Sequence, residues 1–300
     1  MTNESDKASK LAFVGLITGA ICISLAPILV RMSELEPNAT AFQRVFLALP
    51  ILFIWMMVAN RKSISTVKGP LSTNNILWLI VPGVFFAADI GFWHWSIRYT
   101  TIANATLFAN FAPVYVTLAA VVIYKEKFSK NFLIALLIAI IGTVILMGTS
   151  ANLANNYFKG DVLGMITAIF YAAYLISVGR LRSRFNTASV MFWSSFTAAM
   201  VLLPVSIYSG DTIFPETQSG WFTIVALAWV SHVAGQGLIV YALAHLSTAF
   251  SSVSLLVQPV CAALLAWVIF AESLTSLQIM GAVIVLSGIY LARRSSSIKM

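Results

Sequence analysis

The chain has 300 residues, of which 60% are hydrophobic and only 9% are charged. Its mean hydropathy is +0.91, which is too apolar for a soluble domain that must cover its core with a polar surface. The formal net charge of +8 does not indicate a nucleic-acid partner, because the basic residues lie at the ends of apolar runs rather than in one patch. The composition therefore predicts an integral membrane protein.

Ten apolar runs are each long enough to cross a bilayer, which takes about 20 helical residues. The runs are unbroken, whereas a membrane β-barrel would show short segments of alternating hydrophobicity. The first run is longer than the apolar core of a signal peptide, so we expect it to remain as the first helix. The predicted fold is all-α with ten transmembrane helices, near residues 11–30, 39–58, 76–97, 102–123, 131–149, 160–179, 188–208, 221–244, 248–270 and 275–292.

Lysine and arginine are unequally divided between alternate loops. If the N-terminus is cytoplasmic, fourteen basic residues face the cytoplasm and three face outside, namely Arg31, Arg98 and Lys159, with Arg44 just within the second helix. Short loops rich in lysine and arginine stay in the cytoplasm. We therefore expect both termini to be cytoplasmic and the protein to lie in the cytoplasmic (inner) membrane.

Matching residues recur in the two halves of the chain. The interval between them is 146 residues in the later helices and 149 in the first helix of each half. Each half holds five helices, and because five is an odd number the second copy must enter the membrane from the opposite side. We expect two inverted repeats, residues 8–150 and 156–294, which expose a central site to each side in turn. The recurrent pairs are Pro113/Pro259, Glu126/Glu272, Gly142/Gly288, Gly15/Gly164, Thr18/Thr167 and Arg31/Arg180.

Two long segments, Tyr99–Gly142 and His245–Gly288, share a small and polar start, a mid-helix proline, a glutamate thirteen residues later and a glycine sixteen beyond that. With the arginine-bearing segment Ala41–Pro50, they make the chain resemble the ten-helix drug/metabolite transporters that carry two EamA-type repeats. The resemblance spans residues 8 to 294. It implies a secondary transporter that exports small metabolites such as amino acids or aromatic compounds, and it does not select one cargo.

Asp89 is the only carboxylate well inside a predicted helix, where a charge is costly unless it is paired or faces water. Phe86 and Trp93 share its helix face, and aromatic rings beside an acid suit a cation or an amphipathic amine. Arg44 on the second helix lies about 6 Å away along the membrane normal, at 1.5 Å per residue. Two interpretations remain open: Asp89 pairs with Arg44 as a structural clamp, or it contacts cargo or protons.

At the repeat interval, Asp89 and Gly91 correspond to Gly235 and Gly237. Inverted repeats would bring Gly235 to a common central cavity, and the alternative is close packing of small residues between helices. Polar groups on apolar helices complete the candidate site, because in a membrane they line wet cavities or pair with one another. The predicted substrate-binding residues are Asp89, Trp93, Phe86, Asn110, Tyr171, Tyr174, His232, Gln236, Ser251 and Gln258, with Arg44 as a candidate charge partner.

Several single residues leave a choice between a structural and a functional role. His232 is either a satisfied core histidine or a ligand or proton relay. His94, between two tryptophans, belongs either to the interfacial aromatic belt or to the site. Pro113 and Pro259 are either structural kinks or gating hinges. Glu126 and Glu272 are expected at helix ends, where they satisfy neighbouring donors rather than touch cargo.

Other function classes fit less well. The sequence contains no Gly-x-Ser-x-Gly, no His-Glu-x-x-His and no Cys/His metal spacing, so a membrane enzyme is the weakest alternative, and neither a cofactor nor a metal is expected. Cys22 and Cys261 imply no disulfide framework. A channel or a lipid-linked flippase on the same fold is the stronger rival. The expected partners are a small-molecule substrate and the bilayer, with protons as a candidate coupling ion and the chain as a monomer or homodimer.

Overall fold

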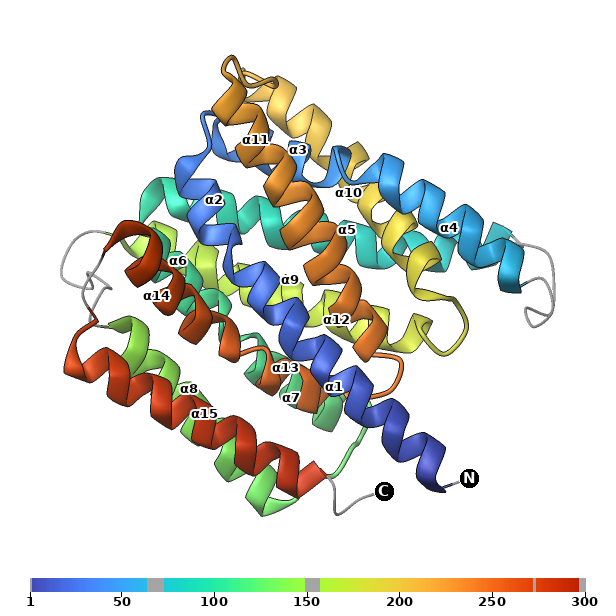
Figure 1. Ribbon diagram of the computed structural model, residues 1–300, viewed down its shortest axis with the longest axis vertical. Coiled ribbons are helices and arrows are strands. Elements are labelled where there is room, and N and C mark those ends of the chain that lie inside the picture. The colour runs from blue at the N-terminus through green and yellow to red at the C-terminus, as the bar shows by residue number, and fades with distance from the viewer. Residues whose placement is uncertain (1, 64–72, 149–156, 272–273, 297–300) are drawn as a thin grey trace.

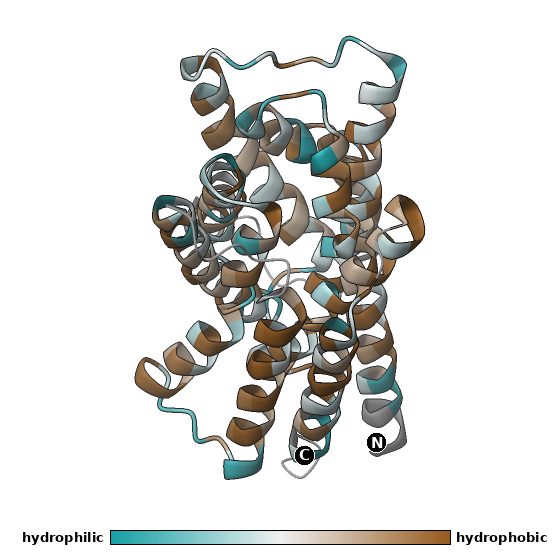
Figure 2. Ribbon diagram, turned by 90° about the vertical axis from the view of Figure 1, so that its left-hand side faces the viewer, coloured by the Kyte–Doolittle hydropathy of each residue, from teal (hydrophilic) through white to brown (hydrophobic). Residues whose placement is uncertain are grey.

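A computed structural model describes residues 2–63, 73–148, 157–271 and 274–296. Every regular element in these residues is a helix, and ten spans are long and apolar enough to cross a membrane. The ten expected spans are therefore confirmed. The first helix begins and the last helix ends at the same end of the molecule, as an even number of spans requires (Figure 1). Hydrophobic residues run along the helices, and hydrophilic residues gather mainly towards the helix ends and loops (Figure 2).

Five spans are single helices. Two of them, α5 and α10, contain an internal proline, Pro82 and Pro204. In a membrane, neighbouring helices and local adjustments of the backbone make such prolines tolerable. The single helices are α5 (Thr73–Tyr99), α8 (Lys130–Gly148), α9 (Phe158–Leu181), α10 (Thr187–Tyr208) and α15 (Ser276–Ser296).

The other five spans are interrupted. In four of them a proline lies within the first three residues after the break. Proline favours such a break because it lacks an N–H and collides with the preceding turn. These prolines are Pro27, Pro50, Pro113 and Pro259. The fifth contains a π-helical stretch, η1. The segments are α1 (Thr2–Ser24) and α2 (Ala26–Met32); α3 (Pro37–Phe46) and α4 (Leu49–Ser63); α6 (Ile102–Ala109) and α7 (Ala112–Val122); α11 (Gln218–Ala226), η1 (Leu227–Gln236) and α12 (Gly237–Ala242); and α13 (Thr248–Ser254) and α14 (Val257–Phe270).

Helices α8 and α15 lie side by side at one edge of the molecule (Figure 1). A Cβ atom on Gly142 would lie 2.6 Å from the backbone nitrogen of Val285, and one on Gly288 would lie 2.7 Å from that of Ala139. Glycine is therefore required for the two backbones to approach so closely. Ala139 and Val285 are themselves 146 residues apart, which is the interval between the two halves. The contact at Gly142 and the contact at Gly288 are therefore equivalent, and the crossing is alike from either helix.

The second and seventh spans also pack along each other, with α3 and α4 against α10. Hydrogen bonds join them at both ends. The Asn38 amide donates to the Ser209 hydroxyl over 3.0 Å, and the Asn186 amide donates to the Asn60 side-chain oxygen over 2.7 Å. The first hydrogen bond lies at one end of the two spans and the second lies at the other end. The two spans are therefore held together along their whole length.

Candidate substrate-binding site

A central cavity of about 110 Å³ lies between the two halves of the chain. The first half contributes residues from α1, α2, α3, α5 and α6, and the second half contributes residues from α9, η1 and α14. Eight residues expected from the sequence meet there, although they come from six elements distant in sequence. They are Arg44, Phe86, Asp89, Trp93, Asn110, Tyr171, Gln236 and Gln258.

Arg44 and Asp89 bring opposite charges to this cavity. Arg44 on α3 is 5% exposed and Asp89 on α5 is 7% exposed, and the two interact electrostatically. The part of the chain that the structure describes shows no direct ion pair between them, and the Nε atom of Arg44 has no hydrogen-bond partner. A buried charge is stable only when it has a partner. Arg44 and Asp89 can therefore each still bind an oppositely charged group of a ligand.

Aromatic rings form one wall. Phe86 lines the cavity and packs against Tyr174, with ring centres 4.9 Å apart, and against His232, with ring centres 5.2 Å apart. His232 is fully buried, and its Nε2 atom lies 2.8 Å from the Ser195 hydroxyl. Tyr174 and His232 are therefore not lining residues, contrary to the prediction, because the Phe86 ring occupies the position in front of them.

Amide side chains provide polar groups on the other walls. Asn110 donates to the Thr106 carbonyl over 2.7 Å, and Tyr171 lies beside Gln258. The Nε2 atoms of Gln236 and Gln258 have no partner within the described protein, so both amides can donate to a ligand.

Ser251 is buried but does not line the cavity, contrary to the prediction. It lies on α13, whereas the cavity is reached by Gln258 and Pro259 at the start of α14. The break between α13 and α14 lies between Ser251 and Gln258, so the two polar residues do not share one continuous helix.

The glycines expected at the cavity pack between helices instead. A Cβ atom on Gly235 would lie 2.8 Å from the Ile23 side chain and 3.1 Å from the Gly19 carbonyl oxygen of α1. Gly237 faces Trp55, and Gly91 faces Leu202. The placement of Gly235 at the cavity was wrong, and the alternative of small-residue packing is confirmed.

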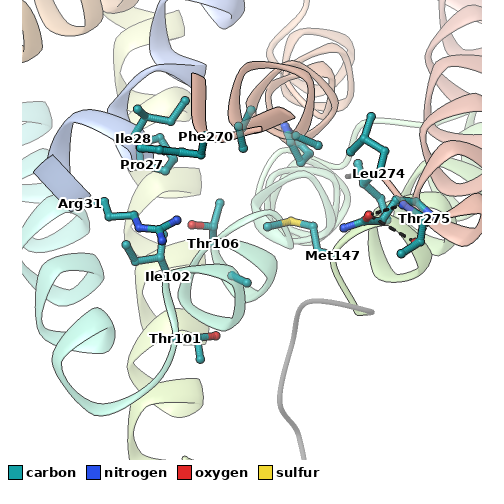
Figure 3. Close-up of a pocket in the computed structure, with 17 residues that line it drawn as sticks. Pro27, Ile28, Arg31, Thr101, Ile102, Thr106, Met147, Phe270, Leu274 and Thr275 are labelled. Atoms are coloured by element: carbon teal, nitrogen blue, oxygen red, sulfur yellow. Dashed lines mark hydrogen bonds between the residues drawn. The ribbon is translucent and has the colours of Figure 1, made fainter. Parts of the chain in front are cut away.

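A larger cavity of about 600 Å³ continues from the central one towards the ends of α2 and α14. The two share Pro27, Thr106, Pro259 and Ala262 in their linings. Figure 3 shows Arg31 and Ile28 on one side of the larger cavity and Leu274 and Thr275 on the other. We call it the outer cavity.

Arg31 lies in the outer cavity with its guanidinium carbon 4.9 Å from the centre of the Phe270 ring. Arg31 is not among the site residues predicted from the sequence. Its recurrence as Arg180 was the signal that could have identified it.

A third space, of about 20 Å³, continues the series in the opposite direction. It shares Asn110, Tyr171 and Gln258 with the central cavity and reaches Ser252 on α13 and Leu255 just after it. The volumes fall from about 600 to 110 to 20 Å³ along this line. The series of cavities is therefore widest beside Arg31 and Phe270 and narrowest beside Ser252.

Four further residues have definite places away from the cavity. His94 is fully buried, with Nδ1 2.6 Å from the Ile90 carbonyl oxygen, so it is not a belt residue, and it does not line the central cavity. Trp95 and Tyr99 are partly exposed near the end of α5, as expected of a belt. Glu126 is exposed beyond α7, and its predicted equivalent Glu272 lies outside the described residues.

The sequence profile of the EamA-like transporter family matches residues 10–148 and again residues 158–294. The chain belongs to this family. The resemblance to the EamA-type drug/metabolite transporters is thereby confirmed, and this EamA-like protein is a multi-pass membrane transporter rather than an enzyme.

Curated relatives agree with this assignment. The pseudopaline exporter CntI of Pseudomonas aeruginosa is 25% identical over 72% of this chain and 74% of its own length. An uncharacterized transporter of Archaeoglobus fulgidus is 23% identical over 87% of this chain and 89% of its own. A solved crystal structure superposes with a TM-score of 0.78 at 16% identity, covering 98% of this chain and 99% of that one, which shows that the EamA-like fold is shared.

Proposed function

We propose that the protein exports small zwitterionic metabolites, either amino acids or amphipathic aromatic compounds, and binds them in the central cavity. The observation that carries the proposal is the presence of Arg44 and Asp89 in one cavity that also holds Phe86, Trp93 and Tyr171. A guanidinium group suits a carboxylate, a carboxylate suits an ammonium group, and aromatic rings suit an apolar or aromatic side chain. Asp89 is also the candidate carrier of a coupling proton.

The same residues favour cargo recognition over a purely structural clamp. A clamp would place the two charges in direct contact, whereas Arg44 and Asp89 interact across a space that they both line. The Nε2 atoms of Gln236 and Gln258, which have no hydrogen-bond partner, belong to side chains that line the same space. Polar groups inside a membrane protein that lack partners are expected to face water or a substrate.

Transport by alternating access between two inverted repeats, residues 8–150 and 156–294, accounts for the shape of the pathway. Three observations support it: the family profile matches twice, the α8–α15 crossing is alike from either helix, and the three cavities in series are widest at one end. Exchanging the conformations of the two repeats would close this end and open the other.

Orientation follows from the distribution of lysine and arginine, which supports cytoplasmic termini in the inner membrane. In that orientation the outer cavity faces the outside and the constricted end faces the cytoplasm. The printed name of the relative CntI describes an exporter, which supports outward transport.

Two measurements test the proposed function. Metabolites exported by cells with and without the protein identify the cargo class, and we expect a zwitterion to accumulate outside. In proteoliposomes, radiolabelled L-phenylalanine should then show saturable counterflow that is lost in Asp89→Asn and retained in Val283→Leu, since Val283 is 57% exposed on α15. Flux that rises linearly without counterflow would instead indicate a channel, and movement of labelled lipid between leaflets would indicate a flippase.

A further inference from the structure

Two arginine–aromatic pairs occupy equivalent places in the two halves of the chain. The guanidinium carbon of Arg31 lies 4.9 Å from the centre of the Phe270 ring, and that of Arg180 lies 3.5 Å from the centre of the Tyr124 ring. Arg31 and Arg180 are 149 residues apart, and Tyr124 and Phe270 are 146 apart, which are the intervals at which the halves recur. The same contact therefore occurs once near the end of α2 and once near the end of α9.

The surroundings of the two pairs differ. Arg31 and Phe270 line the outer cavity. Arg180 and Tyr124 border an apolar groove of about 620 Å³ between α5, α7 and α9, which shares no lining residue with the cavities in series. The pair near α2 thus faces an open pathway, and the pair near α9 does not.

Close contacts between helices seal the pathway on the side of Arg180. A Cβ atom on Gly179 of α9 would lie 2.5 Å from the Thr248 hydroxyl of α13. The rings of Phe13 of α1 and Phe250 of α13 stack with centres 5.9 Å apart. We call these contacts the inner seal.

Residues beside the inner seal correspond to residues that line the open pathway. At the interval of 146, Thr117 corresponds to Ala263, Ala120 to Ala266 and Ser252 to Thr106, and Ala263, Ala266 and Thr106 all line the outer cavity. Their counterparts are buried: Thr117 is 5% exposed, Ala120 6% and Ser252 1%.

Among these buried counterparts, the hydroxyl of Thr117 indicates that the protein has a second conformation. It is buried and has no hydrogen-bond partner in the described protein. A buried hydroxyl without a partner is unfavourable, and this cost is relieved if Thr117 meets water or cargo when the seal opens. Ser252 already borders the smallest of the three cavities, so the pathway ends at this cluster.

We propose that the cytoplasmic entrance of the pathway lies between α7, α9 and α13, and that Arg180 at its rim selects an anionic group of the cargo. The proposal rests on the export function argued above. When α9 and α13 separate at Gly179 and Thr248, Arg180 takes the place that Arg31 now has at the outer cavity. Arg180, Arg44 and Arg31 then offer one carboxylate three successive guanidinium partners along the pathway, each suited to bidentate binding.

Cysteine accessibility tests the position of the entrance. In a background without Cys22 and Cys261, Ala120→Cys should react with a membrane-impermeant maleimide applied from the side of the termini. Its counterpart Ala266→Cys should react from the opposite side, and a condition that increases one reaction should decrease the other. Ala198→Cys, also buried but on α10, is the control and should stay unlabelled. If Ala120→Cys is labelled no faster than this control, the proposed position of the entrance is wrong.

The charge selectivity has a separate test with small thiol reagents. We compare the rates at which an anionic and a cationic methanethiosulfonate modify Ala120→Cys, relative to the same ratio for free cysteine in solution, which Arg180 does not influence. Arg180→Gln should lower this relative ratio at least about fivefold, in line with the interaction of two charges a few ångströms apart in water. Arg180→Lys should restore it, and Arg184→Gln, in the exposed turn after α9, should leave it unchanged. An unchanged ratio in Arg180→Gln would exclude the proposed role.

These outcomes are independent of the cargo. If no metabolite is transported, the proposed function fails while the labelling can still locate an entrance. If L-phenylalanine counterflow is normal and Ala120→Cys stays unlabelled, the entrance is misplaced and the proposed function stands.

Discussion

Ser195 of α10 and His232 of η1 form a buried contact, with the serine Oγ and the histidine Nε2 2.8 Å apart. The imidazole stacks on Phe86, which in turn lines the central cavity. His232 thus lies behind an aromatic wall of the cavity. Of the two alternatives, core histidine or ligand and relay, this placement favours the first, and we predict that His232 positions Phe86.

Removing the Ser195 hydroxyl should therefore lower stability more than it alters binding. Ser195→Ala leaves the His232 nitrogen without a partner, and we expect the free energy of unfolding to fall by roughly 1–3 kcal/mol. Ser194→Ala is the control, because Ser194 donates only to carbonyls of its own helix. Thermal unfolding in detergent measures the difference. Normal stability combined with abolished L-phenylalanine counterflow would contradict the positioning role.

Substitutions at Arg44 and Asp89 separate the clamp from cargo recognition. Asp89→Asn keeps the side-chain volume and loses the charge, so we expect transport to fall at least about tenfold, the equivalent of one charge-assisted hydrogen bond. Adding Arg44→Gln removes the uncompensated cation and should restore folding but not transport. Normal counterflow in a well-folded double variant would establish the clamp.

The α8–α15 crossing should tolerate no side chain at its glycines. Gly142→Ala places a methyl group 2.6 Å from the Val285 nitrogen, and Gly281→Ala places one 2.5 Å from the Leu146 nitrogen, so the helices must move apart. We expect each change to destabilise the protein by roughly 1–3 kcal/mol. Gly148→Ala is the control, since nothing lies within 4 Å of its Cβ position. Equal melting temperatures for Gly142→Ala and Gly148→Ala would show that the crossing is looser than described.

Glu34 provides a pH-dependent contact at the start of α11. Its carboxylate accepts hydrogen bonds from the Thr217 hydroxyl and, over 3.3 Å, from the Thr217 amide. The Thr217 hydroxyl, the largest cause, holds the pKa of Glu34 below its ordinary value. A lowered pKa means that the contact stabilises the folded state above the ordinary glutamate range and that this contribution is lost as the pH falls through the lowered pKa.

Amide exchange checks this contact. Between about pH 7 and about pH 3, exchange in residues 217–220, corrected for its intrinsic pH dependence, should accelerate at the acidic end in the wild type. Glu34→Gln should abolish this step, because the amide does not titrate. An identical step in both proteins would assign the titration to another group.

Orientation can be read from single cysteines at exposed sites. Ser183→Cys, between α9 and α10, should be labelled from the cytoplasm, and Ser209→Cys, beyond α10, should be labelled from outside. Cysteine at Ser65, which lies outside the described residues, should behave like Ser183→Cys because Arg61, Lys62 and Lys68 surround it. Labelling of Ser183→Cys and Ser209→Cys from one side would overturn the ten-span topology.

The sequence by itself determined the number of spans and the residues with unusual chemistry. Apolar length predicts a membrane helix because each helix satisfies its own backbone hydrogen bonds. The energetic penalty for a charge in the membrane singled out Arg44 and Asp89 as residues with unusual chemistry. These are local properties, and neither depends on which helices become neighbours.

Only the tertiary structure decided which polar residues share a cavity. Gly235 and Ser251 are on suitable spans, but Gly235 packs against α1, and the break before α14 separates Ser251 from Gln258. His232 lies behind Phe86 rather than beside Asp89. The direction of a side chain on a broken helix depends on how its segments pack against other helices, and sequence periodicity assumes an unbroken one.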